Sequence, residues 1–220
     1  MNADFVNLLW LFRPPKENNT EFLPLGAFTW NTPKSPPKNI IGLTLHEAGL
    51  LYKYAKEQWK KLPKDDAGNI ILEIGRYWGG TTVLLAHATH DSNVKVVSVD
   101  VVEGCLNSET ENWLNTYEER TRINICVDNS QTMDNLPLSM IFVDGDHTYD
   151  GVKNDVEKVL RPSTKYIVLH DYFEITKDGS YKKYGVKKYV DELISRNICK
   201  KIEQTHTMIV LENIGNEVDD

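Results

Sequence analysis

The chain has 220 residues, of which 40% are hydrophobic and 26% charged, a balance typical of a globular protein and unlike that of a disordered chain. Its 25 basic and 32 acidic residues give a formal net charge of −7 without a long basic block, which argues against partners such as nucleic acid or anionic membranes. No apolar run approaches the roughly 20 residues that cross a bilayer, so no membrane span is expected.

The three cysteines, Cys105, Cys126 and Cys199, are far apart in the sequence and form no Cys-x-x-Cys pair. Neither a disulfide framework nor a cysteine zinc site is therefore indicated. The apolar patch at residues 5–12 lacks a preceding basic region and a small-residue cleavage site, so we predict no signal peptide. These features favour a reducing, cytoplasmic location.

The first segment, residues 1–43, contains most of the nine prolines, together with Phe22, Phe28 and Trp30. Proline removes backbone donors and interrupts regular elements, so we predict an irregular N-terminal arm here. Two interpretations stay open for this arm. It either packs over a hydrophobic surface or forms a lid over a substrate cavity.

The main domain is predicted to span residues 44–212 and to begin with a helix. Apolar residues recur every three or four positions after Thr44, and Thr44-x-x-Glu47 forms a capping-box pattern. Five apolar runs then alternate with segments of helical length, which predicts a parallel sheet covered by helices on both faces. These runs are at residues 70–74, 94–99, 123–127, 140–143 and 166–169.

The C-terminal part departs from this alternation. Helical spacing over residues 186–194 is followed by two apolar runs, 198–202 and 207–211, separated by a short polar segment. This pattern predicts a helix followed by a hairpin, which would place one antiparallel strand in the sheet. The polar tail, residues 213–220, is expected to fray.

A glycine-rich turn follows the first predicted strand, at residues 73–82. Such a turn lets a ligand approach the backbone, and the next helix offers free amides. A phosphate-binding P-loop is a poor match, because Thr81 stands where that motif has lysine. A dinucleotide fingerprint is also weak, because Tyr77 replaces its second glycine.

The same turn, Glu73-Ile74-Gly75-x3-Gly79-Gly80-Thr81-Thr82, resembles the E-x-G-x3-G-x-S/T-T motif of class I S-adenosylmethionine-dependent methyltransferases. It is most similar to small O-methyltransferases of the catechol and caffeoyl type and to related sugar and antibiotic methyltransferases. The resemblance extends from Glu73 to Asp171, and the hairpin carries it to about residue 212. It implies an α/β fold, a Rossmann-like doubly wound seven-stranded sheet that is mostly parallel with an antiparallel last strand. It also implies S-adenosylmethionine as cofactor, with Glu73, Gly75, Gly79, Gly80 and Thr81 at its binding turn.

Two further segments are expected to bind the nucleoside part of this cofactor. Asp100 ends the second predicted strand, where a carboxylate can accept hydrogen bonds from ribose hydroxyls. The segment around Ser130 and Gln131 is similar to the G-A-S-Q segment that touches adenine in catechol-type enzymes, although Asp128 and Asn129 replace its glycine and alanine.

Two aspartates follow buried strands and are expected to meet at one edge of the sheet. Asp144 follows Met140–Val143, and Asp171 follows Tyr166–Leu169 and His170. In the resembling families the first position binds a divalent metal or the amino-acid part of the cofactor. Asp144 and Asp171 are thus candidate ligands for Mg²⁺ or another divalent cation. Tyr172 replaces the asparagine of the catechol pattern, and His170 is considered as a substitute ligand.

His147 lies three residues after Asp144, where the catechol and caffeoyl enzymes have a lysine that takes the proton of the substrate hydroxyl. Imidazole suits this role at neutral pH, so His147 is predicted to be the general base. The competing interpretation is that His147 only caps the following helix.

The sequence therefore predicts a methyltransferase that transfers a methyl group to a hydroxyl of a small molecule or glycan, with Asp144 and His147 as catalytic residues. Metal assistance is considered, and a homodimer is permitted. A non-catalytic cofactor-binding protein and a nicotinamide-dependent oxidoreductase are the alternatives.

Overall fold

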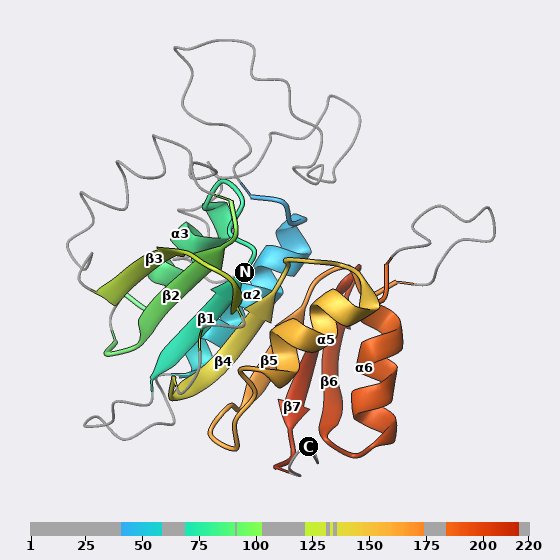
Figure 1. Ribbon diagram of the computed structural model, residues 1–220. Helices are drawn as coiled ribbons and strands as arrows, with labels where there is room; N and C mark the ends of the chain where they lie inside the picture. The colour runs from blue at the N-terminus through green and yellow to red at the C-terminus, as the bar shows by residue number, and fades with distance from the viewer. Residues whose placement is uncertain are drawn as a thin grey trace, which may run out of the picture.

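The computed structural model describes residues 41–58, 69–90, 92–102, 122–130, 133, 136–173 and 184–215. Within these ranges, seven strands form a single sheet with helices on both faces (Figure 1). Most of the predicted arm, Gln131 and residues 216–220 lie outside the described residues. None of the described helices has the length and apolarity that a membrane crossing requires.

The strand order is β3-β2-β1-β4-β5-β7-β6, and β7 runs antiparallel to both of its neighbours. The prediction of a mostly parallel, doubly wound sheet with one antiparallel strand from a terminal hairpin is confirmed. The elements are α2 (Leu45–Gln58), β1 (Ile70–Ile74), α3 (Gly80–Ala88), β2 (Lys95–Asp100), β3 (Ile123–Val127), β4 (Leu138–Val143), α5 (Tyr149–Glu157), β5 (Tyr166–Leu169), α6 (Val186–Ser195), β6 (Cys199–Thr205) and β7 (Met208–Asn213).

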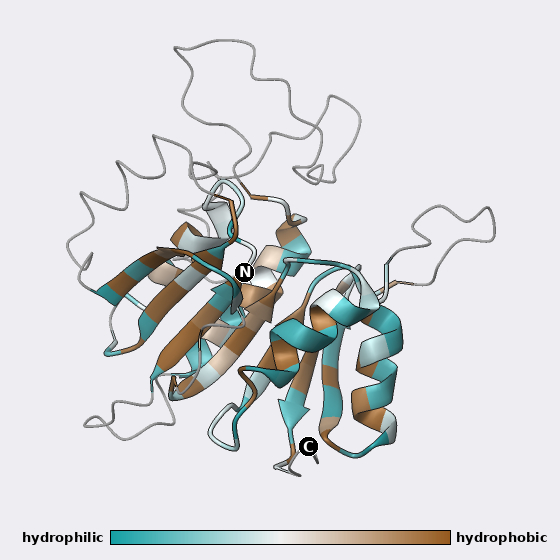
Figure 2. Ribbon diagram, in the orientation of Figure 1, coloured by the Kyte–Doolittle hydropathy of each residue, from teal (hydrophilic) through white to brown (hydrophobic). Residues whose placement is uncertain are grey.

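The central strands are buried on both faces, which explains why they read as continuous apolar runs in the sequence. Successive side chains point to opposite faces: Ile71 and Phe142 pack with α2 and α3, while Leu72 and Ile141 pack with α5 and α6. Figure 2 shows these strands mainly in brown, with more of the polar colour on α5 and α6. Two apolar layers therefore hold the sheet and fix the positions of the strand ends.

Helix α2 begins with the predicted capping box. The Thr44 amide donates to Oε2 of Glu47 at 2.9 Å, and the Glu47 amide donates to Oγ1 of Thr44 at 3.3 Å. The other Glu47 oxygen, Oε1, accepts hydrogen bonds from the amide and the hydroxyl of Thr207, at 2.9 and 2.8 Å. Glu47 thereby joins the start of α2 to the turn between β6 and β7.

A buried ionic cluster surrounds His170, the residue that follows β5. Its Nδ1 lies 3.1 Å from Oδ1 of Asp144, and its Nε2 lies 3.6 Å from Oε2 of Glu47 and 3.3 Å from the Thr207 hydroxyl. Burial alone would lower the pKa of His170, but the charge of Asp144 and hydrogen bonds to Asp144 and Glu47 raise it well above the usual 6.5. Burial also tends to raise the pKa of Glu47, yet the hydrogen bond and charge of His170 bring it well below 4.5. His170 is thus an imidazolium held between carboxylates.

We expect the substitution His170→Gln to lower the free energy of unfolding by about 3–5 kcal/mol at about pH 5.5, because it leaves buried carboxylates uncompensated. The raised pKa of His170 makes its contribution complete below pH 6.5 and progressively lost as the pH rises above that value. The lowered pKa of Glu47 makes its contribution complete above pH 4.5 and lost in more acidic solution. Urea unfolding of both proteins at about pH 5.5 and about pH 8.5 should therefore give a smaller difference at the higher pH. A difference that stays constant or grows with pH would contradict a buried imidazolium.

Gly75 follows β1 with a φ of +87° and lies against the backbone of Asp144, the residue that follows the neighbouring parallel strand β4. A Cβ atom at this position would lie 2.2 Å from the Asp144 carbonyl oxygen, and this neighbour is backbone that cannot rotate away. The Asp144 amide also donates to the Ile74 carbonyl at 2.8 Å. Glycine at position 75 is therefore required for both the left-handed conformation and the close approach of the two strands.

The substitution Gly75→Ala should lower the free energy of unfolding by about 3 kcal/mol or more, because backbone strain and a backbone clash add together. Gly215→Ala is the matched control, since Gly215 has a φ of +80° but a Cβ atom added there would meet nothing within 4 Å. The control should lose only about 1 kcal/mol, from the strain alone. Equal losses in the two variants, measured by urea unfolding, would show that the contact between Gly75 and the Asp144 backbone is not a close one.

Candidate functional site

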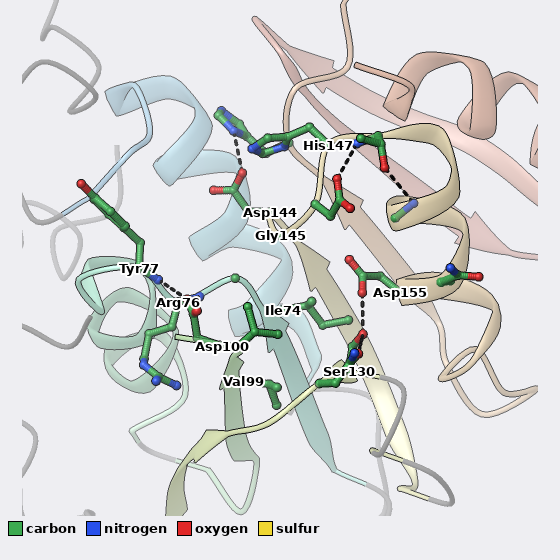
Figure 3. Close-up of a pocket in the computed structure, with 18 of the residues that line it drawn as sticks. Ile74, Arg76, Tyr77, Val99, Asp100, Ser130, Asp144, Gly145, His147 and Asp155 are labelled. Carbon is green, nitrogen blue, oxygen red and sulfur yellow. Dashed lines mark hydrogen bonds and ion pairs between the residues drawn. The ribbon is translucent and has the colours of Figure 1, made fainter. Parts of the chain in front are cut away.

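A cavity of about 820 Å³ opens at the carboxyl ends of the central strands. Its walls come from the residues that follow β1, β2, β3, β4 and β5 and from the start of α5 (Figure 3). The chain runs from β1 through β2 to β3 on one side and then returns to β4 on the other side of β1. This reversal of strand order is where open α/β sheets bind ligands.

The glycine turn forms one wall of this cavity. Gly79 is the N-cap of α3 in the left-handed conformation, with a φ of +84°. Glu73 is fully buried behind the turn, where its two oxygens accept hydrogen bonds from the hydroxyls of Thr81 and Thr82. Burial raises the pKa of Glu73, against the effect of these hydroxyls. Among the predicted cofactor residues of the turn, Gly75 and Thr81 line the cavity, whereas Glu73, Gly79 and Gly80 shape the turn from outside its lining.

Asp100 lies at the end of β2 and accepts three backbone hydrogen bonds. Its Oδ2 receives the amides of Arg76 at 3.0 Å and Tyr77 at 2.8 Å, and its Oδ1 receives the amide of Val102 at 3.0 Å. A carboxylate has about four acceptor positions, so capacity remains for a ligand hydroxyl. The Asp100 carboxylate thus holds the glycine turn in place and also faces the cavity (Figure 3).

The side chain of Arg76 also stabilises this arrangement, and this role was not predicted from the sequence. Its side chain is 2% exposed, and its guanidinium donates to the carbonyls of Ser98 and Cys126, both at 3.0 Å. These carbonyls belong to β2 and β3, so Arg76 ties the two strands to the turn. An arginine inside a glycine motif is an ambiguous sequence signal, because it is equally suited to bind an anionic ligand.

Ser130 lies on the cavity, as the sequence predicted, and has an unpredicted partner. Its hydroxyl donates to Oδ1 of Asp155, a residue of α5 that is 8% exposed (Figure 3). Burial raises the pKa of Asp155, and the charge of Asp146 adds to this effect. The available sequence signal was an acid on the apolar stripe of α5, next to the buried Val152 and Val156.

The opposite end of the cavity brings together Asp144, His147 and Asp171. Nδ1 of His147 lies 3.1 Å from Oδ2 of Asp171, and one ligand atom from each of the three side chains lies within 4.8 Å of the others. Asp171 has a φ of +60°, an uncommon backbone conformation for a residue other than glycine. The convergence expected from the two strand ends is therefore present, and His147 joins it.

His170 does not take the position considered for it as a substitute metal ligand. Both of its ring nitrogens are occupied by Asp144, Glu47 and Thr207, so it neutralises carboxylates rather than facing a metal. His147 does not cap α5 either, because the N-cap is Thr148, whose hydroxyl accepts the Gly151 amide at 3.0 Å. The side chain of His147 is instead available to the cavity, where its ring stacks on Tyr184 at 4.9 Å.

The cavity is strongly acidic. Seven aspartates line it, at positions 100, 128, 144, 146, 150, 155 and 171, and no lysine is among the described lining residues. The guanidinium of Arg76 is bonded to backbone carbonyls, and His170 is surrounded by acids. The site therefore suits a ligand that carries positive charge.

Comparisons with known proteins agree with this description. Residues 72–172 match the family model described as a methyltransferase domain. No curated protein matches the sequence.

The fold is shared with several solved methyltransferase structures at low sequence identity. The S-adenosylhomocysteine-bound methyltransferase PaMTH1 from Podospora anserina is 13% identical, with 82% of each chain covered and a TM-score of 0.57. The O-methyltransferase TomG from Streptomyces achromogenes, solved with S-adenosylmethionine and involved in tomaymycin synthesis, is 18% identical, with 81% of this chain and 83% of TomG covered and a TM-score of 0.57. A geranyl diphosphate methyltransferase in complex with S-adenosylmethionine is 10% identical, with 74% and 85% covered and a TM-score of 0.52.

The matched segment contains β1, the glycine turn, Asp100, Asp144 and Asp171, which are the parts of the site described above. The strand order and the antiparallel β7 are likewise those expected from the motif resemblance. Residues 72–172 thus match a methyltransferase domain, and the chain has the fold of the class I S-adenosylmethionine-dependent methyltransferases.

Proposed function

We propose that the protein is an O-methyltransferase that transfers the methyl group of S-adenosylmethionine to a hydroxyl of a small molecule or sugar. The observation that carries the proposal is the acidic cavity at the glycine turn. A sulfonium cofactor with an ammonium group is attracted by such a site, whereas the pyrophosphate of a nicotinamide dinucleotide is repelled.

The backbone of the glycine turn supports the same conclusion. A dinucleotide or phosphate site needs free amides at such a turn. Here the amides of Arg76 and Tyr77 are bonded to Asp100, and the Gly75 and Gly79 amides are bonded to the carbonyls of Val99 and Arg76, both at 2.9 Å. Four amides of the turn are therefore occupied within the protein, while its glycines still allow a ligand to approach closely.

In this proposal the cofactor lies across the strand ends. Asp100 binds the ribose hydroxyls, Ser130 edges the adenine, and the amino-acid end lies between Gly75 and Asp144. The sulfonium methyl then faces the end of the cavity at which Asp144, His147 and Asp171 converge. Tyr184 and His147 would form part of the wall against which the acceptor packs.

Methyl transfer is an in-line displacement. The acceptor oxygen bonds to the methyl carbon, the carbon–sulfur bond breaks, and its electron pair stays on sulfur as the thioether of S-adenosylhomocysteine. Nδ1 of His147 is paired with Asp171, so Nε2 is the nitrogen available to take the hydroxyl proton. Holding oxygen and methyl in a near-attack geometry supplies much of the acceleration.

Asp144, His147 and Asp171 also form a set of donors that suits a divalent cation. Two carboxylates match Mg²⁺ or Mn²⁺, and the imidazole shifts the preference toward transition metals. Such an ion would polarise the acceptor hydroxyl when bound. His147 would then be a ligand and would not be the base.

We expect S-adenosylhomocysteine to bind in isothermal titration calorimetry and NAD to give no heat of binding. Asp100→Asn should weaken S-adenosylhomocysteine binding by about tenfold or more, because it removes a charge-assisted acceptor for the ribose and loosens the turn. Asp191→Asn is the charge-matched control, since Asp191 lies on α6 and pairs with Lys187.

Binding of NAD in place of S-adenosylhomocysteine would overturn the proposal in favour of an oxidoreductase. Binding of S-adenosylhomocysteine without methyl transfer to any hydroxyl in a panel of phenols, catechols and sugars would favour a non-catalytic binding protein.

The substitution His147→Gln should lower turnover by about 10²- to 10⁴-fold while leaving the Kd for S-adenosylhomocysteine unchanged, because the general base is lost and the cofactor site is kept. Turnover is measured as transfer of a labelled methyl group from S-adenosylmethionine. If His147 is the base, activity persists after chelation with EDTA. Activity that disappears with EDTA and returns with Mn²⁺ or Mg²⁺ would instead assign His147 to a metal site with Asp144 and Asp171.

A further inference from the structure

We propose that Tyr184 is a positioning residue for the base of the reaction, because its ring holds the His147 imidazole in the orientation that keeps Nε2 available to the acceptor hydroxyl. This inference rests on the proposed function, in which His147 takes the hydroxyl proton. It adds a residue that precedes α6 and lies outside the glycine turn and the strand ends. It follows from contacts on the edge, the face and the main chain of His147.

His147 is a cavity residue that its surroundings do not enclose. Its side chain is 32% exposed and lies at one end of the cavity (Figure 3). The ion pair between Nδ1 and Oδ2 of Asp171, at 3.1 Å, holds one edge of the imidazole. A contact through a single nitrogen leaves the ring able to tilt about that contact, and tilting moves Nε2. A second contact, on the face of the ring, is needed to fix the plane of the base.

Tyr184 provides the contact on the ring face. The rings of Tyr184 and His147 are nearly parallel, with an interplanar angle of 5° and centroids 4.9 Å apart, which makes them an offset-stacked pair. Such a pair resists tilting, because a tilt separates the two flat surfaces and loses their dispersion contacts. The edge contact with Asp171 and the face contact with Tyr184 together define the plane of the imidazole. The position of Nε2 is thereby defined as well.

The main chain next to Tyr184 is bonded to that of His147. The Gly185 amide donates to the His147 carbonyl oxygen at 2.7 Å. A Cβ atom at position 185 would lie 2.2 Å from the Tyr149 amide nitrogen, so the chain before α6 passes directly against the start of α5. Gly185 is also the N-cap of α6, whose first residue, Val186, is 3% exposed. Tyr184 is therefore attached to the buried start of a helix, which fixes the position of its ring.

The segment after β5 supports the same arrangement. The ring of Phe173 lies 5.3 Å from that of Tyr184, at an interplanar angle of 39°. The Phe173 amide donates to the Asp171 carbonyl oxygen at 3.1 Å. This segment therefore provides both the carboxylate at the edge of His147 and a ring that packs on the stacking partner of His147. The base is thus held from β5 and from α6, two elements that are anchored in the core.

The tautomer of His147 tests this proposal without any turnover. If the stack holds the ring as we propose, Nδ1 carries the proton that it donates to Asp171, and Nε2 of the neutral ring carries the lone pair. Nitrogen-15 spectra of histidine-labelled protein distinguish the two nitrogens, and the His147 signals are assigned by their absence in His147→Gln. We expect one tautomer in the wild type and in Tyr184→Phe, and exchange between two tautomers in Tyr184→Leu. A wild-type ring that carries its proton on Nε2 would overturn the proposal.

The substitution Tyr184→Leu replaces the flat ring with an apolar side chain of another shape. It should lower kcat by about 10- to 100-fold, because a displaced base loses its alignment with the reacting hydroxyl. The KM for the acceptor and the Kd for S-adenosylhomocysteine should stay unchanged. Tyr184→Phe keeps the stacking surface and should restore most of the turnover. Turnover is measured by labelled methyl transfer to the phenols, catechols and sugars of the panel, and unfolding midpoints show whether each variant is folded.

Failure of this inference and failure of the proposed function are distinguishable. Turnover that His147→Gln leaves unchanged, or absence of methyl transfer to every hydroxyl compound, would refute the proposed function. Where turnover depends on His147, wild-type turnover in Tyr184→Leu, or a loss that Tyr184→Phe does not restore, would refute the role of Tyr184 alone. A higher KM for the acceptor with an unchanged kcat would also refute it, and would make Tyr184 a residue that contacts the acceptor.

Discussion

The buried imidazolium of His170 is the interaction on which the rest of the structure depends. Its two ring nitrogens face Asp144 on one side and Glu47 and Thr207 on the other, so it connects α2, the end of β4 and the β6–β7 turn. Without a positive charge at this place, burial of Glu47 beside Asp144 would be strongly unfavourable. The fold can therefore gather acids at one edge of the sheet only because one cation is built in among them.

His170 neutralises only part of the negative charge of these acids, and the charge that remains favours a cationic ligand. Glu47, Asp144 and Asp171 surround the single cation of His170, so acids outnumber this cation in a partly buried region. A cationic ligand is thus favoured at the end of the cavity where the sulfonium or a metal would lie. The same electrostatic arrangement serves the stability of the domain and the affinity of its site.

The sequence was sufficient to predict what depends on local patterns. The apolar runs gave β1, β3 and β5 with the bounds that the structure has, and the Thr44–Glu47 box is present at the start of α2. Contacts between distant segments were not accessible, because nothing in the sequence connects Glu47 with Thr207, 160 positions later. Asp155 was missed for a similar reason, since the Ser130 hydroxyl that donates to it lies 25 positions earlier.

The glycine turn shows how one side chain can change which groups a local motif offers to a ligand. A strand–glycine–helix turn normally offers its amides to an anion. In this chain, Asp100 takes the amides of Arg76 and Tyr77, and Arg76 in turn occupies the carbonyls of Ser98 and Cys126. Two amides of the turn are therefore occupied within the protein, and the carboxylate that accepts their hydrogen bonds also faces the cavity. Asp100 therefore sets both the conformation of the turn and the negative charge beside it, whereas the glycines provide only the close approach of a ligand.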